Sequence, residues 1–172
     1  MGIGRYRPPQ PKASPYITPQ GYEALQRELS DLWKRRAETT KALAAAAAEG
    51  DRSENAEYIY RKKELRELDR RIRYLQKRLP NLTVVRAAPP NQHRVFFGAW
   101  VTLENEAGEI FEYRIVGADE INPQRGYISI DSPLVQAILK KELNDEALVD
   151  TPQGNVVYRL CAIRYPQPTS EV

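Results

Sequence analysis

Residues 58–82, YIYRKKELRELDRRIRYLQKRLPNL, decide the fold of the first half of the chain. Apolar residues recur there at heptad spacing in two registers: Tyr58, Leu65, Ile72 and Leu79 in one, and Leu68, Leu75 and Leu82 in the other. A heptad repeat places apolar side chains along one seam, as in a coiled coil. The pattern therefore predicts a helix that begins at Asp51 or soon after and ends near Leu79, before Pro80.

A second, weaker heptad pattern precedes this segment. Thr18 suits an N-cap, Pro19 suits the first helical position, and Gly50 suits the position just after a helix. The apolar residues between them again fall into two interrupted registers: Tyr22, Leu29 and Leu43 in one, and Leu25, Leu32 and Ala46 in the other. Matching seams and a connector of two to four residues predict an antiparallel coiled-coil hairpin at residues 16–82. About 30 residues per helix would make the arm ~45 Å long.

Beyond Leu82 the pattern changes to short runs of β-branched and aromatic residues. Strands are predicted at residues 84–85, 95–101, 110–116, 127–130 and 156–163, with a hairpin turn at 105–108 and one helix at 133–142. The predicted fold class is therefore α+β: a helical hairpin, then at residues 83–172 an antiparallel sheet that carries one helix. Residues 1–15 are basic and rich in proline, which is typical of an extended, flexible leader.

Composition limits the classes of function. The 172 residues carry a net charge of +3, with a basic first half and an acidic segment from residue 83 onward. A basic surface suits nucleic acid or a negatively charged protein channel. Because no apolar run approaches ~20 residues and the N-terminus lacks a signal peptide's apolar core, we expect a cytoplasmic protein without a membrane span. A single cysteine, Cys161, excludes an internal disulfide and a cysteine-built zinc site.

The segment GDRSENAEY at residues 50–58 has two interpretations. Asp51 and Glu54 are three residues apart, so Asp51 as N-cap and Glu54 at the third helical position would form a capping box. Alternatively, the two carboxylates share in binding Mg²⁺, which usually takes one or two protein carboxylates and completes its shell with other oxygens. A metal held in this way stabilises the attacking or leaving oxygen in phosphodiester cleavage. The sequence pattern alone favours the cap.

Two further features of the hairpin also have two interpretations. The second helix has an excess of basic residues, which suits either a solvated helix face with ion pairs four residues apart or a nearby polyanion such as RNA. The alanines at 42 and 44–48 suit either a stable exposed helix or a probe thin enough for a narrow channel.

In these residues the chain resembles the bacterial Gre transcript-cleavage factors, and among them the GreB branch. The resemblance rests first on residues 50–58. It continues through the basic run at 60–63, residues 66–74, the segment VFFGAWV at 95–101 and the segment YISIDSP at 127–133. It covers roughly residues 16–166 in order, and the leader before Tyr16 extends beyond what the family usually needs.

The resemblance implies an FKBP-like C-terminal domain and RNA polymerase as partner. That domain would dock at the rim of the polymerase's secondary channel through Ile130, Asp131, Ser132 and Pro133, and the coiled coil would enter the channel. Asp51 and Glu54 would be the catalytic and metal-binding pair that holds Mg²⁺ together with the polymerase, while Arg52, Ser53 and Asn55 would support the tip. The nascent RNA 3′ end of a backtracked complex would lie near the basic residues Arg61, Lys62, Lys63, Arg66 and Arg70. The polymerase itself would hydrolyse that RNA.

Two other functions are alternatives. A regulator that only occupies the channel would share the fold and the partner without stimulating cleavage. A peptidyl-prolyl isomerase would need an aromatic-lined apolar pocket in the FKBP-like domain. Because Phe96, Phe97, Trp100 and Phe111 fall in strand patterns, we interpret them as core residues. We therefore expect no enzymatic activity of the chain's own. We also expect a monomer.

Overall fold

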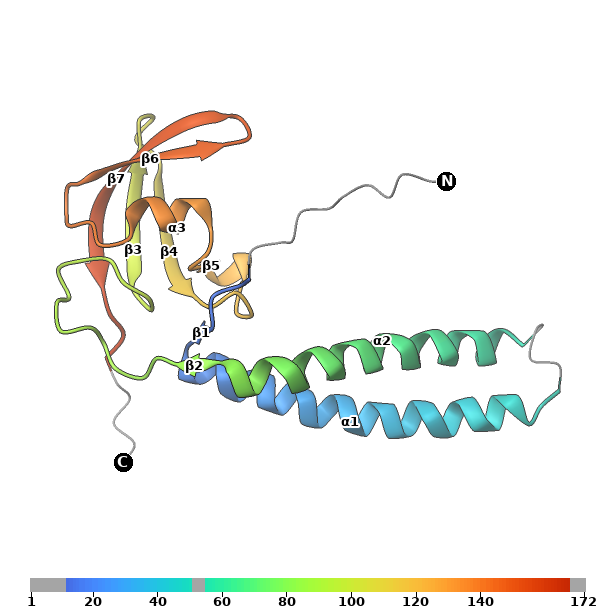
Figure 1. The fold of residues 1–172 in the computed structure, drawn as a ribbon. Helices are drawn as coiled ribbons and strands as arrows, with labels where there is room; N and C mark the ends of the chain where they lie inside the picture. Colours follow the sequence, from blue (N-terminus) through green and yellow to red (C-terminus); the bar gives the residue numbers. More distant parts are fainter. Residues whose placement is uncertain (1–11, 51–54, 168–172) are drawn as a thin grey trace, which may run out of the picture. The chain divides into compact units, whose positions relative to one another are not determined.

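The computed structural model describes residues 12–50 and 55–167, and the structural statements below concern these residues. They form two compact units. One is a helical hairpin within Ile17–Arg86, and the other is an α+β domain whose described residues are 12–16 and 87–167. Figure 1 shows the elements of each unit. No helix in the described ranges is both long and apolar enough to cross a bilayer.

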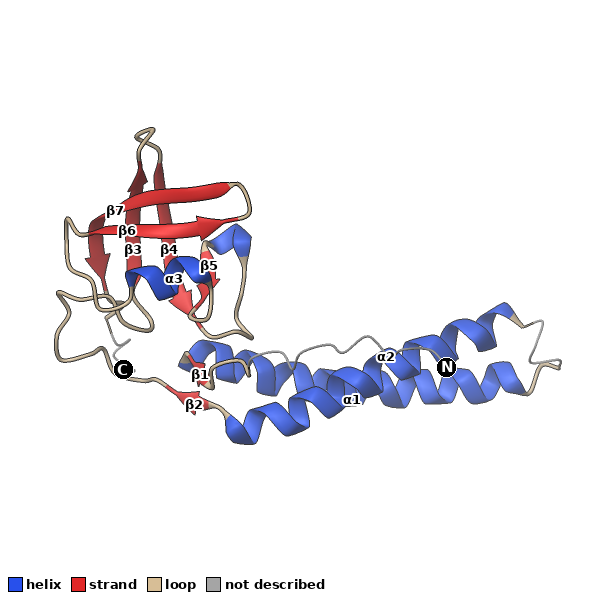
Figure 2. Ribbon diagram, turned by 45° about the horizontal axis from the view of Figure 1, so that its top comes forward, coloured by secondary structure: helices blue, strands red, loops and turns tan. Residues whose placement is uncertain are grey.

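The hairpin consists of α1 (Pro19–Ala47) and α2 (Ala56–Arg78), followed by a 3-10 turn, η1 (Leu79–Asn81). The start of α1 is as predicted: Pro19 lies in the first turn, and the Thr18 hydroxyl accepts a hydrogen bond from the Gly21 amide at 3.1 Å. The two helices lie side by side and run antiparallel in both ribbon views (Figures 1 and 2), which confirms the hairpin. At 29 and 23 residues they are ~43 and ~35 Å long.

The junction between the helices differs from the prediction. α1 ends at Ala47, and α2 begins at Ala56 with Asn55 as its N-cap. The predictions of a two- to four-residue connector and of Asp51 as N-cap are therefore wrong. The physical reason is that asparagine carries a donor as well as an acceptor. Its Oδ1 accepts from the Tyr58 amide at 3.1 Å, while its Nδ2 donates to the Ala46 carbonyl at 2.8 Å.

The hairpin core follows one heptad register of α1. Every seventh residue from Leu25 to Ala46 is buried, and α2 supplies the facing apolar side chains Leu68, Ile72 and Leu75. The polar member of the register, Thr39, is buried because its hydroxyl donates to Glu64 Oε1 at 2.9 Å. At the base, β1 (Tyr16–Ile17) pairs with β2 (Thr83–Val84), and Ile17 is fully buried.

The α+β domain contains a five-stranded sheet in the order β5-β4-β3-β7-β6. Its strands are β3 (Trp100–Asn105), β4 (Ile110–Val116), β5 (Tyr127–Ser129), β6 (Glu146–Thr151) and β7 (Gly154–Arg164). β3, β4, β6 and β7 pair antiparallel, as predicted, whereas β5 pairs parallel to β4 and makes the sheet mixed. The reason is the connection: residues 117–126, with the turn η2 (Pro123–Arg125), lead the chain back so that β5 runs in the direction of β4.

Two boundaries in this domain also differ from the prediction, and one strand is additional. Residues 95–99, predicted as strand, precede β3, and β6 was not predicted. The helix α3 (Pro133–Ile138) begins after the predicted N-cap Ser132 but stops before residue 142. It stops because Leu139 leaves the helical conformation and Lys140 adopts a positive φ of 66°.

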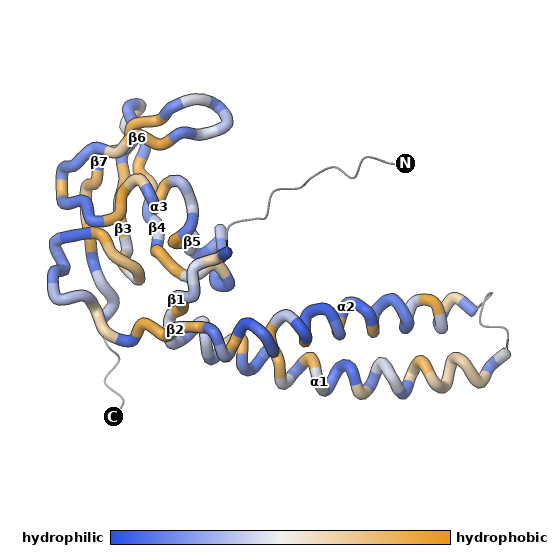
Figure 3. Tube along the Cα trace, viewed as in Figure 1, coloured by the Kyte–Doolittle hydropathy of each residue, from blue (hydrophilic) through white to orange (hydrophobic). Residues whose placement is uncertain are grey.

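One face of the sheet packs against α3 and forms the core of the domain, and Figure 2 shows the short helix lying over the strands. The buried residues include Val101, Leu103, Ile115, Val135, Ile138 and Leu160. Figure 3 shows the corresponding alternation of hydrophobic and hydrophilic residues along the strands. The predicted core residues Phe96 and Phe97 are half-buried and pack against this cluster.

The other face of the sheet carries a row of cations and aromatic rings. The strand register places Arg164, Trp100, Arg114 and Tyr127 side by side across β7, β3, β4 and β5. The Arg164 guanidinium lies 4.7 Å from the centre of the Trp100 ring. The interpretation of Trp100 as a core residue is therefore wrong, because Val101 takes the inward position and alternation turns Trp100 outward.

Candidate functional site

The first candidate site is the end of the hairpin where residues 48–55 connect α1 to α2. Asn55 is half-buried there and ties the two helices together through its hydrogen bonds to Ala46 and Tyr58. The role of Asn55 in supporting the tip within the polymerase stays a prediction. Four other predicted site residues, Asp51, Arg52, Ser53 and Glu54, lie outside the described residues.

The last turns of α1 are built almost entirely from alanine. Ala46 is buried against α2, whereas Ala44, Ala45 and Ala48 are exposed. Figure 3 shows this part of α1 in the pale orange of a mildly hydrophobic stretch. Since alanine stabilises a helix without adding bulk, this end of the hairpin is regular and thin.

Arg61, predicted to lie near RNA, is engaged within the hairpin. Its guanidinium donates to Glu57 Oε1 at 2.8 Å and to Glu64 Oε2 at 3.0 Å. These partners, the Glu57 hydrogen bond above all, raise the pKa of Arg61. The neighbouring Lys62 is exposed, and its ammonium lies 5.9 Å from the centre of the Tyr58 ring.

The other predicted basic residues belong to a longer row on the outer face of α2. The spacing of three, four, three and four residues places its members on one side of the helix, opposite the buried Leu68, Ile72 and Leu75. All are exposed, and none forms a salt bridge within the described ranges. We call this set the outer basic row: Lys63, Arg66, Arg70, Arg73 and Lys77.

The outer basic row spans ~21 Å along α2, which is several phosphate spacings of an extended strand. Arg73 and Lys77 were missing from the predicted RNA-proximal set, although their helical spacing from Lys63 was readable in the sequence. A shallow hollow of about 320 Å³ adjoins the row, between Glu67, Arg70, Arg71 and Tyr74. The row and its hollow form a positively charged surface with an aromatic ring beside it.

The second candidate site is the predicted docking segment between β5 and α3. Ile130 is buried in the core, whereas Asp131 and Pro133 are exposed. The Ser132 hydroxyl caps α3 by accepting from the Val135 amide at 3.3 Å, and the Asp131 amide donates to Ser129 Oγ at 3.0 Å. Ile130 and Ser132 thus fix the backbone, and Asp131 and Pro133 supply its exposed side chains.

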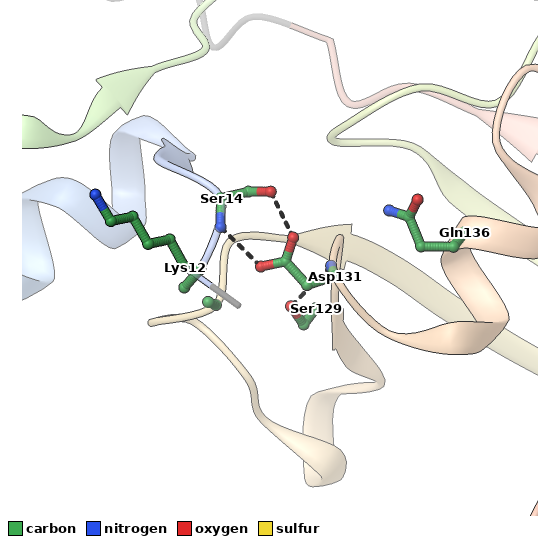
Figure 4. Close-up of a pocket in the computed structure, with 7 residues that line it drawn as sticks. Lys12, Ser14, Ser129, Asp131 and Gln136 are labelled. Carbon is green, nitrogen blue, oxygen red and sulfur yellow. Dashed lines mark hydrogen bonds between the residues drawn. The ribbon is translucent and has the colours of Figure 1, made fainter. Parts of the chain in front are cut away.

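Asp131 has a partner that the sequence did not indicate. The Ser14 amide donates to Asp131 Oδ2 at 2.9 Å, and the Ser14 hydroxyl donates to Asp131 Oδ1 (Figure 4). Ser14 lies 117 positions away along the chain, so no local pattern signals this contact.

A basic helical hairpin followed along the chain by a small domain with a mixed sheet is the order of elements expected from the resemblance to the transcription elongation factors. Two family models match the chain: the N-terminal domain of the GreA/GreB transcription elongation factors at residues 15–84, and their C-terminal domain at residues 89–165. The chain belongs to this family, in its GreB branch.

Two curated relatives support this assignment. The chain is 54% identical over 165 residues to the transcription elongation factor GreB of Pseudomonas aeruginosa and to that of Xanthomonas axonopodis pv. citri. In both cases the match covers 95% of this chain and 98% of the relative. It is 27% identical to the GreA factor homolog 1 (Gfh1) of Thermus thermophilus, covering 87% of this chain and 97% of that one, with a TM-score of 0.40.

Proposed function

We propose that this elongation factor binds RNA polymerase and stimulates the polymerase's own cleavage of backtracked RNA, so that arrested complexes resume synthesis. The α+β domain docks at the rim of the secondary channel, and the hairpin enters the channel with its connector foremost. The hydrolytic reaction belongs to the polymerase, and the chain supplies side chains to it. In this role it works as a monomer in the cytoplasm.

The observation that carries the proposal is the assignment of the α2 cap to Asn55. The competing interpretation of Asp51 and Glu54 was a capping box, which requires Asp51 to be the N-cap. With Asn55 in that position, the first turn of α2 does not need the Asp51 carboxylate. Both acids belong to the connector between the helices, which supports their use toward a partner.

The donor set suits Mg²⁺. Two carboxylates supply the hard oxygens that this ion prefers, and they leave most of its six positions to water and the polymerase. Asp51 and Glu54 are the residues that would hold it, at an end of the hairpin whose exposed alanines add little bulk. When bound, Mg²⁺ stabilises charge on the attacking or leaving oxygen of a phosphodiester.

The outer basic row gives the hairpin a second contact with the complex. Its five cations suit the phosphates of the extruded RNA 3′ segment, which Lys and Arg contact without reading sequence. Arg61 has a different role, because its two glutamate partners direct it along the helix. It stiffens the first turns of α2 behind the connector.

The test is a cleavage assay on a stalled, backtracked polymerase complex. Asp51→Ala and Glu54→Ala are expected to abolish the shortening of the RNA while binding to polymerase persists. Glu49→Ala removes an exposed acid from the same connector and serves as the matched control, with activity retained. Unchanged cleavage by both variants would refute the metal role. RNA extension blocked without any shortening, by the unmodified chain, would favour a regulator that only occupies the channel.

A further inference from the structure

Residues 12–16, which we call the N-terminal strap, are anchored to the α+β domain at several points. Ser14 binds Asp131 through both its amide and its hydroxyl. The Tyr16 ring lies 5.9 Å from the Phe97 ring, centre to centre. The Tyr16 carbonyl oxygen passes so close to Gly117 that a Cβ at that position would collide with it. The α+β domain therefore provides Asp131 as the hydrogen-bond partner of Ser14. Gly117, which has no Cβ, leaves room for the backbone of the strap at Tyr16.

The contact fixes the Asp131 carboxylate without neutralising it. Each carboxylate oxygen accepts one hydrogen bond from Ser14 and retains a further lone pair. Serine is uncharged, so the negative charge stays available to a cation. The Asp131 amide is held by Ser129, so that backbone and side chain are both restrained. An exposed aspartate normally samples several rotamers, and this one is oriented in advance.

An open cavity of about 530 Å³ lies beside this carboxylate, between the strap and residues Ala118, Ser129 and Gln136. Figure 4 shows the Asp131 carboxylate meeting Ser14 at the edge of this space, while the Lys12 side chain extends away from it. Lys12, the described cation nearest in sequence to Ser14, thus does not pair with the Asp131 carboxylate.

We propose that the N-terminal strap is part of the polymerase-docking surface, and that Ser14 is a positioning residue that holds Asp131 for a lysine or arginine of the polymerase. The inference rests on the proposed function, because it requires the α+β domain to be the docking domain. A carboxylate already held in one orientation loses less conformational entropy when a guanidinium or ammonium binds it. The cavity gives that side chain a place beside the carboxylate.

The test measures the affinity of the full chain for RNA polymerase with four variants: Ser14→Ala, Ser14→Thr, Asp131→Ala and the double variant Ser14→Ala/Asp131→Ala. Ser14→Ala is expected to weaken binding about fivefold, the size of one modest hydrogen-bond effect. Ser14→Thr keeps the hydroxyl and is expected to bind as the unmodified chain does. The double variant is expected to bind no more weakly than Asp131→Ala, because Ser14 acts only through that carboxylate.

Cleavage rates separate positioning from catalysis. Ser14→Ala is expected to raise the concentration for half-maximal cleavage and to leave the rate at saturation unchanged. Gly117→Ala displaces the strap without altering Ser14 or Asp131, and should weaken binding to a similar degree if thermal melting shows it folded.

The outcomes distinguish this inference from the proposed function. If Asp131→Ala weakens binding and Ser14→Ala does not, the positioning role of Ser14 is wrong, and the proposed docking through Asp131 is retained. Tighter binding by Ser14→Ala would make the strap a competitor of the polymerase and overturn the inference. If Asp131→Ala binds normally, the inference fails together with this docking residue, while the cleavage assay on Asp51 and Glu54 still tests the proposed function.

Discussion

Asn55 joins the two helices of the hairpin by donating from Nδ2 to the Ala46 carbonyl oxygen at 2.8 Å. Its Oδ1 at the same time accepts from the Tyr58 amide at 3.1 Å. One side chain therefore gives the Ala46 carbonyl, which also accepts from the Glu49 amide at 3.2 Å, a second hydrogen bond from across the connector. The same side chain supplies an acceptor for the Tyr58 amide, which lies in the first turn of α2 and would otherwise lack a helical partner.

Replacing Asn55 is expected to loosen this end of the hairpin. Asn55→Ala should lower the free energy of unfolding by about 1–2 kcal/mol, because an N-cap and a partner of the Ala46 carbonyl are lost together. It should also reduce stimulated cleavage, because the connector is less well held. Asn55→Asp keeps the cap acceptor and loses the donor, so an intermediate loss is expected. Urea unfolding followed by helical circular dichroism measures the first effect, and the stalled-complex assay measures the second.

Asn81→Ala is the matched control, because Asn81 also donates to a helix carbonyl, that of Lys77, at 2.8 Å. It lies at the opposite end of the hairpin, so cleavage should be retained. Equal losses of cleavage in Asn55→Ala and Asn81→Ala would mean that overall hairpin stability, and not the connector, controls activity.

Arg71 and Glu28 form a second link between the helices. The guanidinium binds both carboxylate oxygens, at 2.7 and 3.0 Å, and both side chains are partly exposed. Bidentate geometry makes this pair stronger than an ordinary surface ion pair, so a double-mutant cycle of Arg71→Lys with Glu28→Gln should give a coupling of about 0.5–1 kcal/mol. The Arg27–Glu23 pair is far more exposed and serves as the control, with a smaller coupling. Couplings of the same size would mean that the second hydrogen bond adds nothing.

The outer basic row is expected to set the salt dependence of binding to the backtracked complex. Changing Lys63, Arg66 and Arg70 to glutamine should lower the slope of log affinity against log salt by about 2, since each phosphate contact to a single strand contributes roughly 0.7. Activity on long backtracked RNA should fall more than on short RNA. Arg61→Gln, which changes a cation held by Glu57 and Glu64, should leave the slope nearly unaltered. Equal effects on long and short RNA would indicate general docking.

Local patterns predicted the features that local interactions control. Heptad spacing identified the seam from Leu25 to Ala46, and Thr18 and Ser132 were recognised as caps because each accepts an amide three residues ahead. The hairpin turn between β3 and β4 was readable for the same reason: Gly108 has a φ of +80° and its amide donates to the Asn105 carbonyl at 3.0 Å.

Features that depend on distant partners were not predicted. β6 is an edge strand whose Leu148 is 61% exposed, so its inward residues Ala147 and Val149 give only a faint alternation. The parallel pairing of β5 depends on the path of residues 117–126. Asn55 replaced Asp51 as the cap because of a carbonyl on the other helix. The candidate site was therefore predictable as a motif, with Asn55 among its supporting residues, whereas the hydrogen bonds of Asn55 with Ala46 and of Ser14 with Asp131 were not.

The last prediction concerns Tyr165, whose buried hydroxyl donates to the Arg94 carbonyl and accepts from the Phe96 amide at 2.9 Å. Burial raises the pKa of Tyr165 above its ordinary value of 10.0. The folded state therefore favours the protonated phenol. Its contribution to stability is complete below about pH 10 and is lost as the pH rises from there through the folded-state pKa, because the unfolded chain ionises first.

Tyr165→Phe is expected to lower the free energy of unfolding by about 1–2 kcal/mol at pH 7, since it leaves the Phe96 amide without its acceptor. It should also reduce the loss of stability between pH 10 and pH 11. Urea unfolding of the full chain in a Trp33→Phe background measures both effects, because Trp100 then reports on the α+β domain alone. Tyr60→Phe, an exposed position in the hairpin, is the control and should change neither quantity. A pH dependence of Tyr165→Phe parallel to that of the unmodified chain would show that another group, such as Tyr113, whose pKa burial also raises, controls the alkaline transition.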